Sequence, residues 1–273
     1  MADETRIMSR ANRRVSEVLC LRRQTERRRK GLFLAEGVRE VTRAFEAGLA
    51  VRQVYACPGL LRTESVPIRA RLSRLPATER FEVTEPVMQK LAYRQDPEGI
   101  LAVVEQPQWR LEAMGPIVGP DLWLIAVGLT KPGNLGAMAR TAAAAGASGL
   151  LLADSVVDAF NPNAIRASTC AVFSLPIARA STEAVLGFIR RRSAVIVAAD
   201  PRADEPYTCV DLTGPVALVI GAEDVGLQGP WRRPDGGRRV SIPVARGTVD
   251  SLNAGVAAAV LLFEAVRQRS PRD

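Results

Sequence analysis

The sequence predicts an α/β fold with two domains, of which the second is built on a mostly parallel sheet. From residue 31 onward, short runs rich in valine, isoleucine and leucine alternate with stretches of helical periodicity. Such alternation is typical of a sheet with helices on both faces. A length of 273 residues suits two domains. A segment rich in proline and glycine, residues 106–120, breaks both periodicities and predicts the linker between them.

The first domain, residues 31–105, is expected to be a small α/β unit. Short apolar runs predict its strands, and apolar residues at helical spacing predict its helices. The expected strands are Leu32–Leu34, Val51–Ala56, Phe81–Val83 and Ile100–Val104, and the expected helices are Val38–Ala47 and Pro86–Ala92.

The second domain, residues 121–273, is expected to have helices on both sides of its sheet. Continuous runs of valine, isoleucine and leucine are typical of strands that are buried on both faces. The expected strands are residues 122–127, 150–152, 194–199 and 216–220, and the expected helices are residues 135–145, 161–171 and 251–268. The stretch 232–239 contains one proline and two glycines, and it predicts a flexible, basic and solvated loop.

Positive charge is concentrated at the front of the chain. The net charge is +8 with a pI near 10.0, and residues 1–30 carry ten basic side chains against four acidic ones. Such a segment predicts a basic arm that suits a polyanion, most commonly nucleic acid. The alternative is a solvated arm whose arginine content partly reflects genomic bias. The expected RNA contacts of this arm are Arg22, Arg23, Arg27, Arg28, Arg29 and Lys30.

The chain contains no histidine, which excludes several kinds of active site. Ser-His-Asp and Cys-His groups, HExxH metal sites and histidine general bases are all ruled out. The four cysteines form no CxxC pair, so thiols in a reducing cytoplasm are expected, with no metal site. No apolar run reaches the roughly 18 residues of a membrane span and no signal peptide is recognisable, so we expect a cytoplasmic protein without membrane contact.

Three segments share one design, in which a strand runs into a turn with glycine or asparagine and a helix follows. They are Lys131–Thr141, Val219–Leu227, and Ser241–Pro243 together with Ser251–Ala254. Open α/β sheets bind ligands at the carboxyl ends of their strands. Each segment alone has an ordinary explanation as a strand-end turn, a strand terminator or a helix cap. Together they predict a ligand site.

The absence of two motifs narrows the kind of ligand. The dinucleotide fingerprint GxGxxG and the phosphate loop GxxxxGK[ST] are both missing, which counts against cofactors held by their phosphates. An adenosine-type ligand without phosphate needs an apolar slot instead. Gly221 would let the backbone approach such a ligand closely, and Ile242-Pro243 and Leu252 would form two apolar walls.

These segments resemble the three motifs of the SpoU class of SPOUT RNA methyltransferases over about residues 120–270. The motifs are Asn134-x-Gly136-x-x-x-Arg140-Thr141, Ile220-Gly221-x-Glu223-x-x-Gly226-Leu227, Ile242-Pro243 and Ser251-Leu252-Asn253. Arg166-Ala167-Ser168 resembles a further Arg-x-Ser segment ahead of Phe173-Ser174-Leu175-Pro176. The chain departs from the pattern at Gly128, where many members carry an acidic residue, and at Cys170, where they carry a small one.

The resemblance implies a parallel-sheet C-terminal domain with a deep trefoil knot, which general folding rules would not predict. It also implies S-adenosylmethionine bound in the knot, an obligate homodimer, and methyl transfer to a ribose 2′-hydroxyl of RNA. The N-terminal α/β domain, with Glu36-Gly37 after its first strand, resembles the RNA-binding fold of ribosomal protein L30e. The implied cofactor-binding residues are Ile220, Gly221, Ile242, Pro243 and Leu252. The implied catalytic residues are Asn134, Arg140, Glu223, Ser251 and Asn253, and Arg166 joins the RNA-binding residues.

Two questions stay open in the sequence. Family accounts make Arg140 the general base, but a guanidinium stays protonated in proteins. The alternative is that Arg140 grips the adjacent RNA phosphate and lowers the pKa of the hydroxyl electrostatically. For the substrate, the basic front and the separate N-terminal domain favour 23S ribosomal RNA, with a housekeeping or an antibiotic self-resistance role. The alternatives are tRNA, a catalytically inactive RNA-binding module, and a nucleotide-linked oxidoreductase.

Overall fold

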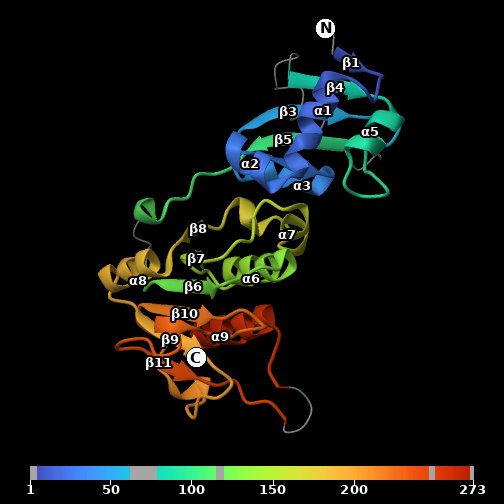
Figure 1. Cartoon of the computed structure of the whole chain (residues 1–273). Coiled ribbons are helices and arrows are strands. Elements are labelled where there is room, and N and C mark those ends of the chain that lie inside the picture. The colour runs from blue at the N-terminus through green and yellow to red at the C-terminus, as the bar shows by residue number, and fades with distance from the viewer. Residues whose placement is uncertain (1–4, 62–78, 115–119, 246–249, 271–273) are drawn as a thin grey trace. The chain divides into compact units, whose positions relative to one another are not determined.

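The computed structural model describes residues 5–61, 79–114, 120–245 and 250–270. The chain divides into two compact units, each with its own sheet (Figure 1). The N-terminal unit comprises Met1–Pro107 with Phe160–Ile165, and the C-terminal unit comprises Gln108–Ala159 with Arg166–Asp273. Within the expected linker, residues 115–119 lie outside the described residues.

The sheet of the N-terminal unit has five strands in the order β1-β4-β3-β5-β2. Their bounds are β1 (Thr5–Ile7), β2 (Leu32–Glu36), β3 (Val51–Ala56), β4 (Arg80–Val83) and β5 (Ile100–Glu105). The strand β5 runs antiparallel to both β2 and β3, while β4 is parallel to β1 and β3. The four strands expected here are therefore confirmed, and β1 is an addition.

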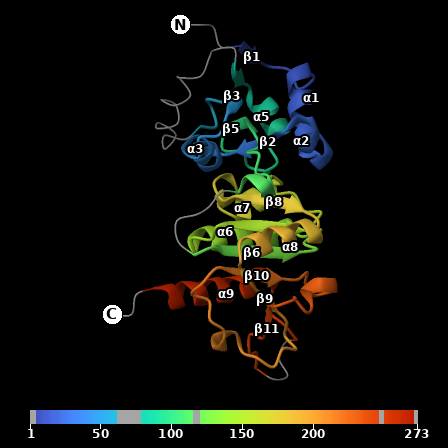
Figure 2. The same ribbon diagram turned by 90° about the vertical axis from the view of Figure 1, so that its left-hand side faces the viewer.

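The helices of this unit are α1 (Arg13–Leu19), α2 (Gln24–Lys30), α3 (Val38–Glu46) and α5 (Glu85–Leu91). Figure 2 shows α1 and α3 on opposite sides of the sheet. The described part of the expected basic arm is not separate from this unit. It forms β1, α1 and α2, and it buries Val15, Val18 and Leu21 in the same core as Tyr55 and Leu101. With Ile7 of β1, four buried apolar residues attach this arginine-rich segment to the core.

The sheet of the C-terminal unit has six parallel strands in the order β11-β9-β10-β6-β7-β8. Their bounds are β6 (Leu122–Val127), β7 (Gly149–Ala153), β8 (Ile177–Ala180), β9 (Val195–Ala199), β10 (Val216–Ile220) and β11 (Arg238–Val240). The chain builds outward from β6 to β8 and then returns to the other side of β6. The strand order therefore reverses between β6 and β10, the position at which such sheets bind ligands.

The helices of this unit are α6 (Pro132–Ala144), α7 (Pro162–Ala167), α8 (Thr182–Arg191) and α9 (Ala254–Arg269). Short 3-10 helices are η1 (Cys20–Arg22) in the first unit and η4 (Leu111–Ala113), η5 (Ala171–Phe173), η6 (Tyr207–Cys209) and η7 (Gly229–Trp231) in the second. The helix α8 packs on one face of the sheet, where the rings of Phe188 and Trp123 meet edge to face at 5.0 Å. The helices α6 and α9 lie together on the opposite side (Figure 1).

The helices α6 and α9 approach closely because small residues face each other. A Cβ atom on Gly255 would lie 3.1 Å from the Cβ of Ala137, tighter than ordinary packing allows. This contact sets the first turn of α9 against the first half of α6. It thereby brings together two of the three motif segments, which are more than a hundred residues apart in the sequence.

Several expected element boundaries were wrong. The expected helix over residues 161–171 ends as α7 at Ala167, because Thr169 and Cys170 adopt positive φ angles of 49° and 71°. The strand β8 and the helix α8 were missed, and β11 occupies part of the expected loop over residues 232–239. Arg238 and Arg239 of that stretch are tied by ion pairs to Glu205 and Asp200. None of the described helices is long and apolar enough to cross a membrane.

Candidate active site

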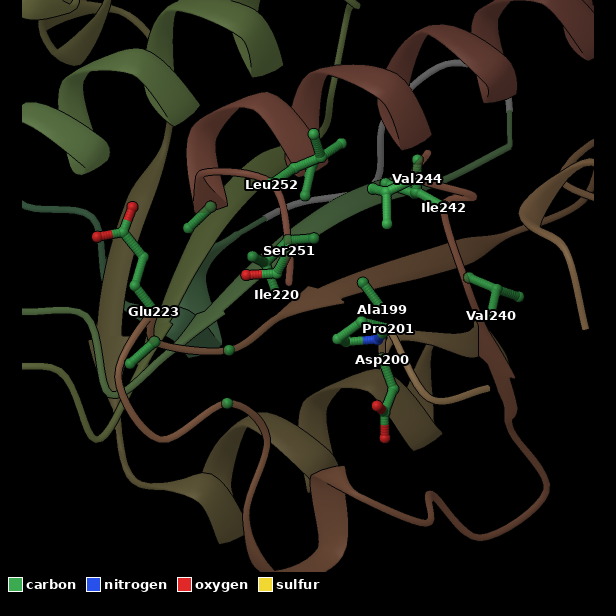
Figure 3. A pocket seen from close by; sticks show the side chains of 15 residues that line it. Ala199, Asp200, Pro201, Ile220, Glu223, Val240, Ile242, Val244, Ser251 and Leu252 are labelled. Atoms are coloured by element: carbon green, nitrogen blue, oxygen red, sulfur yellow. The ribbon is translucent and has the colours of Figure 1, made fainter. Parts of the chain in front are cut away.

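A pocket opens at the carboxyl ends of three neighbouring strands, β9, β10 and β11, beside the start of α9 (Figure 3). Its volume is about 130 Å³, whereas a single water needs only about 10–15 Å³. The pocket is therefore a ligand-sized cavity and not a packing defect. Its lining residues are Ala199, Asp200, Pro201, Ile220, Gly221, Ala222, Glu223, Gly226, Val240, Ile242, Val244, Ser251, Leu252, Ala254 and Ala257.

The walls of the pocket are apolar. Ile242 and Leu252 contribute walls as the sequence predicted, and Figure 3 shows Leu252 beneath α9 with Ile242 and Val244 further along the same side. Pro243 differs from the prediction, since it is exposed and does not line the pocket. Val240 and Ala199 were missed by sequence reasoning. Both residues end buried strands, and the pocket lies at those strand ends, so this position could have predicted them.

Gly221 is needed for a reason other than the predicted one. A Cβ atom there would lie 2.5 Å from the carbonyl carbon of Gly226 and 2.7 Å from the amide nitrogen of Leu227. The group that lies close to Gly221 is thus the backbone of Gly226 and Leu227, whereas the prediction was a bound ligand. The turn closes with the Gly226 amide donating to the Ala222 carbonyl at 2.9 Å, and Gly226 takes a φ of 63°. This tight crossing forms the floor of the pocket and holds Glu223 on the turn.

A polar cluster joins the three motif segments. The Asn253 side-chain Nδ2 donates to Oδ1 of Asn134 at 3.1 Å and also to Oε1 of Glu223. The Oδ1 of Asn253 accepts the amides of Gly255 and Val256 at 3.0 and 3.4 Å, so the same side chain caps α9. Capping fixes the oxygen toward the helix and leaves the nitrogen to face the cluster.

Lys131 completes this cluster, and sequence reasoning did not single it out. Its Nζ donates to Oε2 of Glu223 and forms an ion pair with it. Hydrogen bonds from Lys131 and then from Asn134 hold the pKa of the Glu223 carboxyl below its ordinary value. The hydrogen bond with Glu223 raises the pKa of Lys131 in turn. Both groups are therefore charged at neutral pH, and Glu223 is a hydrogen-bond acceptor but a weak base.

The remaining predicted site residues take different positions. Ser251 lines the pocket with Glu223, so the pocket and the polar cluster share an edge. Arg140 lies exposed near the end of α6, and its side chain makes no hydrogen bond or ion pair with another described residue. Arg166 is exposed at the end of α7. The structure thus brings together Asn134, Glu223, Ser251 and Asn253, and it leaves the two arginines facing solvent.

The six expected RNA contacts of the N-terminal unit fall into two groups. Arg27 is 2% exposed, and its Nη1 donates to the carbonyls of Leu21 and Arg22 at 2.8 Å. The prediction that it contacts RNA is therefore wrong, because the buried guanidinium is hydrogen-bonded to the backbone between α1 and α2. The others are exposed, namely Arg22, Arg23, Arg28, Arg29 and Lys30.

The described residues hold no group of three or more histidine, cysteine, aspartate or glutamate side chains that could bind a metal ion. All four cysteines carry free thiols. The polar side chains of the candidate site carry carboxylate, amide, hydroxyl and ammonium groups.

Two family models match the chain. The model of the SpoU rRNA methylase family matches residues 121–263, which contain the pocket and the polar cluster. The model of an MRM3-like substrate binding domain matches residues 12–102. A 23S rRNA (uridine(2479)-2′-O)-methyltransferase of Streptomyces viridochromogenes is 35% identical over 271 residues, covering 97% of this chain and 92% of that protein.

Solved structures agree with this similarity over nearly the whole chain. An RNA 2′-O ribose methyltransferase structure has 41% identity and a TM-score of 0.83, and the match covers 97% of this chain and 99% of that one. An AdoMet-bound rRNA methyltransferase from Sinorhizobium meliloti has 30% identity and a TM-score of 0.85, with coverage of 96% and 97%. The chain therefore belongs to the SpoU rRNA methylase family, by the match of its C-terminal domain and by 35% identity to a relative over 97% of its length.

Proposed function

We propose that this protein transfers a methyl group from S-adenosylmethionine to a ribose 2′-hydroxyl of 23S ribosomal RNA. The observation that carries the proposal is the shared edge of the apolar pocket and the polar cluster, where Glu223 and Ser251 belong to the pocket and Glu223 also binds Asn253. A pocket for the methyl donor thus adjoins groups that can orient a hydroxyl. Similarity to a 23S rRNA 2′-O-methyltransferase over 97% of the chain favours this substrate over tRNA.

The pocket fits S-adenosylmethionine better than a dinucleotide. Its lining includes the carboxylates of Asp200 and Glu223 and, among the described residues, no lysine or arginine. A cofactor with two phosphates needs cationic or amide donors, and no cationic side chain lines this pocket among the described residues. The apolar walls offered by Ile220, Ile242 and Leu252 suit an adenine ring. Pro243 stays outside this assignment because it does not line the pocket.

The chain's own residues would position the ribose and hydrogen-bond to its 2′-hydroxyl. S-adenosylmethionine supplies an activated methyl group, so the protein mainly has to align an oxygen with it. Asn134 and Asn253 offer fixed amides at the site, and Glu223 offers a carboxylate oxygen as acceptor. The Arg140 guanidinium offers only N–H donors and no acceptor. In this proposal it therefore holds the phosphate beside the target ribose and stabilises the negative charge that develops on the 2′-oxygen.

The finer architecture is part of the same proposal. The C-terminal domain, residues 121–273, would form the deep trefoil knot of its family, and residues 31–105 an RNA-binding domain like ribosomal protein L30e. A homodimer is supported by α9, where Val256 and Phe263 lie seven residues apart on one face and are each 49% exposed. A second copy would cover this apolar face. A cytoplasmic location would give the enzyme access to ribosomal RNA.

Mapping the methylated nucleotide tests the proposal most directly. Purified protein is incubated with S-adenosylmethionine and with unmodified transcripts of 23S rRNA or tRNA, and 2′-O-methyl sites are read as stops of reverse transcription at low nucleotide concentration. We expect one strong stop in 23S rRNA. A stop in tRNA alone would replace the substrate, and methyl transfer to neither, with NAD and not S-adenosylmethionine binding in calorimetry, would overturn the proposal.

A further inference from the structure

Lys131 is the one residue of the polar cluster that neither the motifs nor the pocket include. It is 57% exposed in its side chain, although Glu223 beside it is only 23% exposed. An ammonium has three donors, and only the bond to Oε2 of Glu223 is found among the described residues. Two N–H groups therefore face solvent at the entrance to the cluster.

The backbone holds Lys131 in a fixed position. Pro132 follows it, and Lys131 has the extended angles, φ −88° and ψ 118°, that a residue before proline prefers. Its carbonyl accepts the first hydrogen bond of α6 from Leu135 at 3.2 Å. The side chain thus starts from a rigid helix entrance, and the ion pair with Glu223 fixes its far end. A surface lysine without such supports would lose more side-chain entropy on binding a ligand.

The charge of the cluster favours a second cation, in addition to the Arg140 proposed above to hold the RNA phosphate. Glu223 stays ionised, and an RNA ribose brings a phosphate diester that is bonded to the carbon next to the one bearing the 2′-hydroxyl. Without a cation between them, the carboxylate and the phosphate would repel each other. An ammonium that already touches the carboxylate can reach the phosphate with a second N–H.

Given the proposed function, we propose that Lys131 is a positioning residue that bridges Glu223 and the RNA phosphate beside the methylated ribose. One N–H orients the carboxylate, which in turn fixes the amide of Asn253. A second N–H binds the phosphate. The residue therefore contributes to RNA affinity by direct contact, and to the rate of transfer through Glu223.

The test compares Lys131→Met and Lys131→Arg with wild type in steady-state methylation of 23S rRNA and in RNA binding at several salt concentrations. Lys131→Met should raise KM for RNA about tenfold, and it should reduce the slope of log K against log salt by about 0.7–0.9, the share of one phosphate. Lys131→Arg should restore the slope. Affinity for S-adenosylmethionine should stay within about twofold in both, because Lys131 does not line the pocket.

The control is Arg238→Met, which removes a cation of similar exposure, 55%, from its ion pair with Glu205 in the same unit as Lys131. Its slope should equal that of wild type. In the wild-type background, Lys131→Met should also lower kcat, because Lys131 orients Glu223. In a Glu223→Gln background, Lys131→Met should leave kcat unchanged but should still reduce the slope. An unchanged slope in Lys131→Met, or an equal change in Arg238→Met, overturns the assignment. Absence of methylation by the wild type would instead contradict the proposed function, so the two failures are distinguishable.

Discussion

The pocket and the polar cluster share an edge but are built on opposite principles. The pocket is made of apolar side chains and backbone at the ends of adjacent strands, so each wall contributes independently. The cluster is made of four polar side chains from three distant segments, and each group is held by another. A change in a wall should therefore have a graded, local effect. A change in the cluster should reach several groups at once, because hydrogen-bonded networks are not additive.

Arg140→Ala has the largest expected effect, and it tests whether residues that contact RNA act separately from the cofactor pocket. Loss of the guanidinium should lower kcat about 10³-fold, the upper range for removing one charge-stabilising donor. Affinity for S-adenosylmethionine, measured by calorimetry, should stay nearly intact because Arg140 does not line the pocket. A comparable loss of cofactor affinity would contradict its placement on the RNA side.

Asn253→Ser separates the two tasks of one cluster residue. Serine is also a good helix cap, so thermal stability should stay close to wild type. The amide donors to Asn134 and Glu223 are lost, and kcat should fall about 10²-fold. Asn253→Ala serves as the comparison, since it should lose the same activity and in addition about 1 kcal/mol of stability. Full activity in the serine variant would show that Asn253 only caps α9.

Leu252→Ala tests the independence of the pocket walls. Removing most of a partly buried leucine side chain should weaken S-adenosylmethionine binding by about 1–2 kcal/mol, or roughly tenfold. The kcat at saturating cofactor should change by less than about threefold, because Leu252 has no bond to the cluster. If kcat instead falls as far as in Asn253→Ser, the pocket wall and the polar cluster do not act independently.

The pH profile sharpens the view of the cluster as an ion pair. The lowered pKa of Glu223 means that the pair is complete above the ordinary glutamate pKa of about 4.3 and is lost as the pH falls below it. The raised pKa of Lys131 means that it is lost only as the pH rises above about 10.4. Activity at saturating substrates should therefore be flat between about pH 6 and 9. A rise with an apparent pKa near neutrality would indicate a general base.

The smallest effects are expected from the exposed cations of α2 and of Arg23 directly before it. The triple variant Arg23→Ala, Arg28→Ala and Lys30→Ala should weaken RNA binding and flatten its salt dependence, with no change in thermal stability. Arg27→Ala is the matched opposite, since it should lower stability by about 1–3 kcal/mol because buried carbonyls lose their donor. Equal salt slopes for the triple variant and wild type would leave α2 without a role in RNA binding.

The sequence predicted four of the six strands of the C-terminal sheet, because continuous runs of valine, isoleucine and leucine favour buried strands. It missed β8 and β11, which are short and carry arginine. It also identified the residues of the cluster, except for Lys131, whose role depends on a partner ninety-two residues away that no local pattern reveals. The N-terminal segment was misjudged because its charge hides three apolar residues at helical spacing. Gly221 was chosen correctly for its missing side chain, but only the fold shows that Gly226 and Leu227 fill that space.

The backbone crossing under Gly221 also determines where this enzyme could be redesigned. Enlarging a site for a bulkier sulfonium donor usually means trimming a side chain, and the floor of this pocket has none to trim. A side chain added at Gly221 would itself meet the main chain of residues 226–227, so this position has to stay glycine. Room can be made only at replaceable walls such as Leu252, Ile242 and Val244. Donor analogues extended toward that side are therefore the ones for which an engineered variant of this protein could be selected.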